Sequence, residues 1–416
     1  MNSTLASTVQ NALNKPFDPT LVTVVAFIFA SFYLYTKSKV SSIGKNANKT
    51  ISEAKPAKSS FYNKHNSTQL QITPLTEFKW NEDNEPLKSM PFKNAPYKLT
   101  MGIRSLEAQD WLLIEPTYLS RLEHKRRILN NCHPAYPKTR DLRSSTLFAS
   151  EEAREAVVEF YDIVMDYCLR KYPTCFATTT DSESEYHNQT LIHNLITNKK
   201  YPLKGNGIEP KVLEEYLSQN IEEDFIILLK DPLRAHEEYG EEYWFKAGVF
   251  GFAAGFDPKE RFNKPLTSIH QLIPGYTTKL KTSMNRFFDR LSPGQFVTRS
   301  NWSMQTHKNF YVDDQNKGHN LPNGHEQKAI PYESLNFDDV RYRSERQVLT
   351  KLPKSGAVVF TIRTYLIPIE EIRNEGPEVC ERLIGAIKGF PDDIKQYKAA
   401  GEWGPAIIQY LSKKLD

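Results

Sequence analysis

The stretch Arg343–Tyr365, RSERQVLTKLPKSGAVVFTIRTY, predicts two strands joined by a tight turn. Residues 347–352 and 357–366 are rich in β-branched and other apolar residues, which favour strands. Between them, residues 353–356 supply the proline, serine and glycine that are typical of turns. The segment is therefore expected to form a β-hairpin.

This hairpin carries three arginines and a glutamate among apolar neighbours. Because successive side chains of a strand face opposite ways, Arg343 and Glu345 share one face and Arg346 lies on the other. A guanidinium in apolar surroundings needs an anion, which can be a carboxylate of the protein or of a bound ligand. An Arg/Glu network that braces the sheet and a site for an anionic ligand both stay open at this point.

Helical and strand-like segments precede the hairpin. Residues 118–130 have helical character, and residues 150–172 form the strongest helical pattern, with Cys168 on its apolar face as a buried hydrophobe. Strand-like runs follow at 225–229, 243–252 and 296–304. Several strands connected by turns or helices predict an α+β fold, an antiparallel sheet flanked by helices.

Small residues follow the run at 243–252, where Gly251 and Gly255 flank two alanines. Their spacing does not match a dinucleotide-binding glycine loop, and no helix start follows them. Such residues instead let a bulky group lie close to a sheet, either a flat macrocycle or another helix.

Three segments of the chain resemble a known family, the haem-dependent oxidative N-demethylases. They are Arg261–Gly294, with Ile269-His270-x-x-Ile273-Pro274-x-Tyr276 and Phe287–Leu291 inside it, then Arg299–Ser303, and then the arginine hairpin. The resemblance covers about residues 92–372. It implies a PAS-like haem domain, with an antiparallel sheet flanked by helices.

The resemblance also implies an activity: dioxygen is activated at haem b, and a small amine loses a methyl group as formaldehyde. Electrons must come from an external donor, because the sequence contains no flavin or nicotinamide fingerprint and no ferredoxin-like cysteines. A reductase partner with a flavin or an iron–sulfur centre is expected. A haem-based gas or redox sensor, or a family member without activity, is the alternative.

His270 is the residue we expect to ligate the haem iron. It lies in an apolar setting ahead of a helix expected at about 276–291. A neutral imidazole there can donate one lone pair to iron while its other nitrogen donates to a carbonyl. A lone histidine of this kind is usually a satisfied core residue, and the resemblance is what favours the ligand. The other expected cofactor-binding residues, arginines for the haem propionates and aromatic residues for packing, are Arg299, Arg343, Arg346, Arg363, Tyr276 and Trp302.

Glu345 is expected to hold one of these arginines in place or to face an amine substrate.

The N-terminus predicts a single membrane span. After a tail at 1–19, residues 20–36 carry no charge and are just long enough to cross a bilayer. Residues 37–90 are polar and are expected to form a flexible tether. The N-demethylase-like domain is expected at 91–375, with C-terminal helices at 376–416 packed on it.

Lysines at 37, 39, 45 and 49 outnumber the single lysine before the span, which favours a cytosolic main domain on the endoplasmic reticulum or another internal membrane. The glycosylation sequons at Asn48, Asn66, Asn188 and Asn301 would favour the opposite orientation if they carry sugar.

Composition excludes several other classes of function. The net charge of +4 is too small and too evenly spread for a nucleic-acid-binding protein. The four cysteines show no metal-binding spacing and are expected to be free thiols. A lumenal glycosyltransferase would share the anchor, tether and domain layout, but the chain lacks the expected Asp-x-Asp for the nucleotide sugar.

Overall fold

The computed structural model describes residues 62–63, 66–82, 85–313 and 327–413, which lie within one compact unit, residues 60–416. No helix in these ranges is long and apolar enough to cross a lipid bilayer. The expected anchor, residues 20–36, lies outside the described residues, as do the tail at 1–19 and most of the tether. The membrane span therefore stays a prediction.

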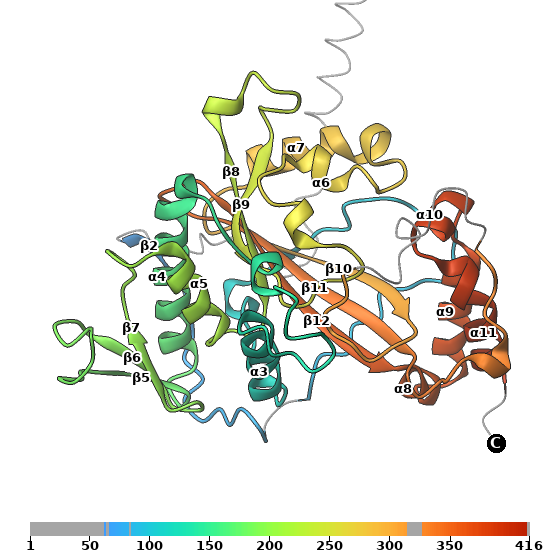
Figure 1. The fold of residues 1–416 in the computed structure, drawn as a ribbon, viewed down its shortest axis with the longest axis horizontal. Coiled ribbons are helices and arrows are strands. Elements are labelled where there is room, and N and C mark those ends of the chain that lie inside the picture. Colours follow the sequence, from blue (N-terminus) through green and yellow to red (C-terminus); the bar gives the residue numbers. More distant parts are fainter. Residues whose placement is uncertain (1–61, 64–65, 83–84, 314–326, 414–416) are drawn as a thin grey trace, which may run out of the picture. The chain divides into compact units, whose positions relative to one another are not determined.

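A seven-stranded antiparallel sheet forms the centre of this unit, with the strand order β3-β10-β11-β12-β8-β9-β4 (Figure 1). The strands are, in that order, β3 (Arg104–Leu106), β10 (Phe296–Gln305), β11 (Arg341–Lys351), β12 (Val358–Pro368), β8 (Asp224–Lys230), β9 (Tyr243–Val249) and β4 (Leu147–Ala149). Helices flank this sheet (Figure 1). The predicted α+β class is confirmed.

The predicted arginine hairpin is confirmed as β11 and β12, which pair without interruption from Arg341↔Pro368 to Lys351↔Val358. Gly356 closes the turn with φ +68°, a conformation that suits glycine. β10 and β8 pair with the outer edges of the hairpin. The hairpin is therefore in the middle of the sheet, which explains why most of its residues are buried.

The two faces of the sheet are covered by different helices. We call the face that carries Arg299 and Glu345 the front face, and the face that carries Arg346 and Arg363 the back face; strand pairing fixes this alternation. The segments that pack with the front face in one apolar cluster are α6 (Leu266–His270), η6 (Tyr276–Leu280) and α7 (Lys281–Arg290). The helix predicted at 276–291 is thus present, and its first turn is a π-helix.

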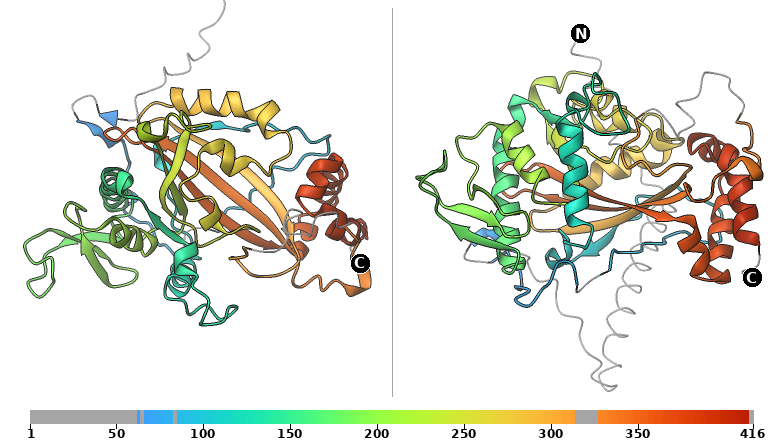
Figure 2. Two further views of the ribbon diagram at one scale, coloured as in Figure 1. Left: turned by 45° about the horizontal axis from the view of Figure 1, so that its top comes forward. Right: turned by 60° about the horizontal axis from the view of Figure 1, so that its bottom comes forward.

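Two groups of helices cover the back face, at opposite ends of its long strands (Figure 2). At one end lie α4 (Arg154–Lys171) and α5 (Pro210–Ser218). At the other end lie α8 (Ile369–Asn374), α9 (Pro377–Lys388), α10 (Asp392–Tyr397) and α11 (Ala400–Ser412). The helices predicted within 150–172 and after residue 376 are confirmed, and Cys168 is buried in the core.

α3 (Tyr118–Leu129) was predicted at 118–130. It explains why a small residue is needed at Gly251, one of the two glycines that follow β9. A Cβ atom on Gly251 would lie 2.8 Å from Cγ of Lys125 on this helix. The group that lies close to Gly251 is therefore a helix side chain.

Part of the segment assigned to the tether belongs to the folded unit. Leu70 is buried in the core, and the amide of Leu75 donates to the carbonyl of Lys171 at 2.8 Å. The rings of Phe78 and Tyr172 lie 5.0 Å apart. These apolar side chains are widely spaced in a polar segment, so they form no apolar pattern in the sequence. The folded unit therefore includes residues before the boundary expected near residue 91.

The remaining elements are short. A second sheet and a two-stranded pair contain β5 (Phe176–Thr179), β6 (Leu191–Asn194), β7 (Lys199–Pro202), β1 (Tyr62–Asn63) and β2 (Asn66–Leu70). The single-turn helices are η1 (Ala108–Asp110), η2 (Arg143–Ser145), η3 (Glu151–Ala153), η4 (Pro232–Arg234), η5 (Pro258–Glu260) and η8 (Tyr332–Ser334).

Candidate functional site

His270 ends the short helix α6 on the front-face side of the sheet. Its Nδ1 lies 2.7 Å from the carbonyl oxygen of Leu266, one turn earlier. Burial lowers the pKa of His270 to about 4, so the imidazole is neutral at pH 7. Because a carbonyl only accepts, Nδ1 carries the proton and Nε2 keeps its lone pair. No side chain among the described residues is hydrogen-bonded to Nε2.

Tyr276 supports the His270 ring from one side. The two rings are stacked, with centroids 4.9 Å apart and planes 12° apart. The hydroxyl of Tyr276 donates to Sδ of Met284 on α7 at 3.7 Å. The structure therefore brings together two of the predicted site residues, His270 and Tyr276.

Glu242 ties the two front-face helices to the sheet. Its carboxylate accepts hydrogen bonds from the amide and hydroxyl of Thr267 on α6, at 2.7 and 2.6 Å, and from Asn285 on α7, at 2.8 Å. It directly precedes β9, and its side chain is buried. This carboxylate fixes where α6 holds His270, a role that the sequence pattern did not reveal.

Arg299 lies on the front face of β10, close to His270. Burial has the larger effect on the pKa of His270, and the positive charge of Arg299 lowers this pKa further. The Nε of Arg299 is buried without a hydrogen-bond partner, and Arg299 forms no ion pair with any described residue. Oε1 of Gln347, at the paired position on β11, is also buried without a partner. These two polar atoms at paired positions of one face are suited to hydrogen-bond a polar ligand.

Glu345 lies next to this pair on the same face. Its carboxylate accepts hydrogen bonds from Arg343 at 3.2 Å, Gln347 at 2.9 Å and Asn301 at 3.2 Å. It therefore holds Arg343 in place, which is one of the two roles expected for it. Arg343 also donates to the carbonyls of Phe310, at 3.2 Å, and Phe252.

The other predicted arginines point to the back face. Arg346 donates to the carbonyls of Trp111, at 2.9 Å, and Asp110. Arg363 is fully buried and forms ion pairs with Glu115 at 2.7 Å, Glu222 at 2.6 Å and Glu223 at 3.0 Å. Both guanidiniums thus have acceptors within the protein, as in the bracing network left open from the sequence.

Trp302 also lies on the back face, because it pairs with Ser344. Its ring stacks on Phe390 at 5.5 Å, and its carbonyl accepts from Lys398 at 2.9 Å. It packs against the C-terminal helices and not beside His270.

Three residues near the site were missed from the sequence. The charge of Arg261 acts on the pKa of His270, and it forms no ion pair with the described residues. Tyr97 lies before β3, and Tyr397 lies on α10. Burial raises the pKa of both hydroxyls; the charge of Arg299 acts on Tyr97, and the charge of Glu345 acts on Tyr397. These residues come from segments far apart in the sequence, so only the fold reveals them.

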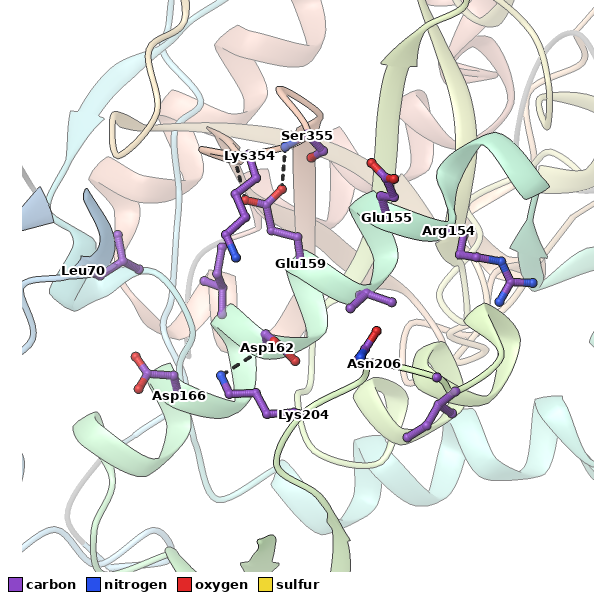
Figure 3. A pocket seen from close by; sticks show the side chains of 14 residues that line it. Leu70, Arg154, Glu155, Glu159, Asp162, Asp166, Lys204, Asn206, Lys354 and Ser355 are labelled. Atoms are coloured by element: carbon purple, nitrogen blue, oxygen red, sulfur yellow. Dashed lines mark hydrogen bonds and ion pairs between the residues drawn. The ribbon is translucent and has the colours of Figure 1, made fainter. Parts of the chain in front are cut away.

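A separate cleft of about 700 Å³ lies along α4 (Figure 3). Glu159 there accepts from the backbone amides of Lys354 and Ser355, at 2.7 and 2.8 Å. The cleft contains none of the predicted site residues. Within the described ranges, no group of three or more His, Cys, Asp or Glu side chains is arranged so that it could hold a metal ion.

The front-face residues fit the group that the sequence resemblance implies. A haem needs one neutral imidazole for its iron and cations for its propionates. His270 supplies the imidazole with a lone pair on Nε2, and Arg299 and Arg261 are guanidiniums without carboxylate partners among the described residues. The donor set therefore fits a haem through His270, Arg299 and Arg261, with Tyr276 behind the ligand.

The model of the family described as "haem-dependent oxidative N-demethylase, alpha subunit-like" matches residues 102–408. The match includes the whole front face, α6, α7 and the C-terminal helices up to α11.

Proposed function

Because the chain belongs to the haem-dependent oxidative N-demethylase, alpha subunit-like family, we propose that it binds haem b through His270 and acts as a monooxygenase-type oxidoreductase on a small amine. One amine, one dioxygen, two electrons and two protons would give the demethylated amine, formaldehyde and water. The observation that carries this proposal is the neutral His270 on α6 near Arg299 of the front face, whose guanidinium forms no ion pair with a described residue.

The residues of the front face have separate roles in this proposal. His270 would bind the iron through Nε2. Because Nδ1 donates its proton to the carbonyl of Leu266, Nε2 stays unprotonated. Tyr276 holds the plane of the ligand by stacking. Arg299, with Arg261, neutralises the propionates. When bound, the haem supplies the redox chemistry with dioxygen.

Glu345 is the carboxylate best placed to meet an ammonium group of the substrate, because it lies two residues from Gln347 on the same face. Its three donors already hold it in one orientation. A preorganised carboxylate attracts an amine without having to reorganise on binding.

The order of the strands supports the proposal of a PAS-type haem domain. Taken in chain order from β8 to β12, the five long strands lie side by side as second, first, fifth, fourth and third. The helices between the second and third of these strands, α6 and α7, pack on one face. This order, with helices at that place, is typical of PAS-type domains, which hold ligands between those helices and the sheet.

The electron donor and the membrane complete the proposal. A separate protein with a flavin or an iron–sulfur centre would deliver the electrons. Residues 20–36 would anchor the chain in an internal membrane with the main domain in the cytosol, where a shared surface raises the effective concentration of the donor. Protease protection in sealed microsomes tests this: a protected main domain contradicts the orientation.

An absorption spectrum of the purified chain supplied with haem tests the ligand. We expect a Soret band that His270→Ala weakens or shifts. Arg299→Gln should lower haem affinity by about tenfold, the value of one lost charged hydrogen bond of about 1.5 kcal/mol, and leave the ligand signature unchanged. A wild-type chain that takes up no haem, or a spectrum unchanged by His270→Ala, contradicts the proposal.

Formaldehyde release separates an enzyme from a sensor. The haem-loaded chain, given dimethylamine, dioxygen and a chemical reductant, should release formaldehyde. Glu345→Gln should raise the KM for the amine while the Soret band stays in place. A haem-loaded chain that releases no formaldehyde from any methylated amine would instead be a sensor or an inactive family member.

A further inference from the structure

The outer surface of η6 and α7 carries a stripe of basic residues. Lys279, Arg286 and Arg290 are exposed, and none of them forms an ion pair with a described residue. Arg286 and Arg290 are four residues apart on one helix, where like charges destabilise the helix by a few tenths of a kcal/mol. We call these three residues the basic stripe.

The surroundings of the basic stripe do not neutralise it. The one carboxylate on α7 is Asp289, which is paired with Lys230 at 2.8 Å. Lys351 lies beside the same residue and donates to its carbonyl at 3.5 Å. Glu241, in the loop before β9, also acts on Lys230, and Lys281 of α7 lies over the Tyr239 ring of the same loop at 4.0 Å. With Lys281 and Lys351 added to the basic stripe, the local charge is positive, although the whole chain has a formal charge of only +4.

The buried side of the same helix leads directly to His270. Met284 and Phe288 point into the front-face core. Met284 accepts the hydroxyl of Tyr276 at 3.7 Å, and the Tyr276 ring stacks on His270 at 4.9 Å. One layer of side chains thus separates the surface helix from the expected iron ligand.

We propose that the basic stripe is the docking surface for an acidic one-electron carrier protein that reduces the haem. The inference rests on the proposed function. Each encounter would pass one electron: the carrier loses it, the haem iron goes from ferric to ferrous, and no covalent bond forms or breaks. Charge complementarity speeds such encounters and orients the carrier over α7.

The exposed positions within the stripe favour a protein over a membrane as the partner. They include Thr282 and Ser283, which are small and polar. A helix that binds a bilayer places large apolar or aromatic side chains between its basic residues. An acidic protein needs only the charges.

The test compares two charge reversals in the full-length chain. The stripe variant is K279E/R286E/R290E, and the matched control is K138E/K211E/K388E, which changes the net charge equally at exposed lysines of other segments. Binding of a purified plant-type [2Fe–2S] ferredoxin and of a purified flavodoxin, both acidic, is measured by calorimetry. Haem reduction by each carrier after photoreduction is measured by stopped flow.

We expect the stripe variant to bind and to be reduced at least about tenfold more weakly than wild type, while the control changes less than about threefold. Wild-type binding should weaken between about 50 and 200 mM salt, as the Debye length shortens. Equal effects of the two variants, no effect of the stripe variant, or no binding of either carrier at low salt would overturn the inference.

Flotation with anionic phosphatidylserine vesicles tests whether the basic stripe binds a membrane instead. Flotation with these vesicles that depends on the stripe, without carrier binding, would assign the surface to a membrane and overturn the inference. A chain that takes up no haem contradicts the proposed function. If the haem-loaded stripe variant binds the carriers as well as wild type does, only the proposed docking surface is contradicted.

Discussion

Arg363 and Arg299 lie on adjacent parts of one sheet, yet the same substitution should affect them in opposite ways. Arg363→Gln removes the cation from a fully buried group of carboxylates, whose nearest oxygens lie 2.7 Å (Glu115), 2.6 Å (Glu222) and 3.0 Å (Glu223) from the guanidinium. Burial opposes the charge of Arg363, but these carboxylates outweigh it and raise the pKa of Arg363 well above its usual value.

The expected loss of stability follows from the carboxylates that lose this cation. Glu222 keeps an ion pair with Arg121 at 3.2 Å, whereas Glu115 and Glu223 keep none with a described residue. Breaking a buried ion pair by removing one partner destabilises a protein by about 3–5 kcal/mol. With an unfolding entropy of roughly 2 cal/mol/K per residue, a folded unit of this size should melt about 4–7 °C lower. Because unfolding free energies are about 5–15 kcal/mol, Arg363→Gln removes roughly a fifth or more of the total.

Arg299→Gln is the matched control. Burial lowers the pKa of Arg299, with only partial compensation by Glu345, and no ion pair with a described residue is lost on substitution. The unfolding free energy of the haem-free chain should therefore stay within about 1 kcal/mol of wild type or rise. The assay is urea denaturation of the haem-free full-length chain, followed by tryptophan fluorescence.

Two results would refute this reasoning. One is an Arg363→Gln variant within about 1 kcal/mol of wild type, which would mean that the carboxylates do not depend on this cation. The other is an equal loss for Arg299→Gln, which would mean that Arg299 is a structural residue and not one reserved for a ligand.

Three further outcomes are expected. Burial lowers the pKa of His270 from 6.5 to about 4, so between these pH values the unfolded chain binds more protons than the folded chain. The unfolding free energy should therefore fall as the pH drops from 6.5 to 4, by up to about 1.4 kcal/mol per pH unit, and haem should be released over the same pH range. His270→Ala should remove this part of the pH dependence in urea titrations. Gly248→Ala should prevent stable folding, since its Cβ would lie 2.3 Å from the carbonyl oxygen of Phe225, whereas Gly404→Ala, with its nearest contact at 3.5 Å, should melt no lower than wild type in a thermal scan. Of the four free thiols only Cys132 is exposed, so a thiol reagent should label one cysteine quickly in the native chain and none in Cys132→Ser; fast labelling of a second thiol would contradict the buried positions of the others.

The sequence by itself determined the elements around the site. Strand propensity and the turn at 353–356 predicted the central hairpin, and apolar periodicity predicted α4 and the C-terminal helices. These features are local, because a strand or helix is specified by residues a few positions apart. The family followed from short motifs on α6, η6, α7, β10 and the hairpin.

Only the tertiary structure decided which charged residues have partners. From the sequence, the arginines at 299, 343, 346 and 363 were equivalent donors. In the fold, strand alternation and the approach of distant segments give Arg363 three carboxylates, while Arg299 keeps a buried nitrogen without a hydrogen bond. The physical reason is that an ion pair or a ligand site depends on residues brought together from more than a hundred positions apart, and no local pattern records that distance.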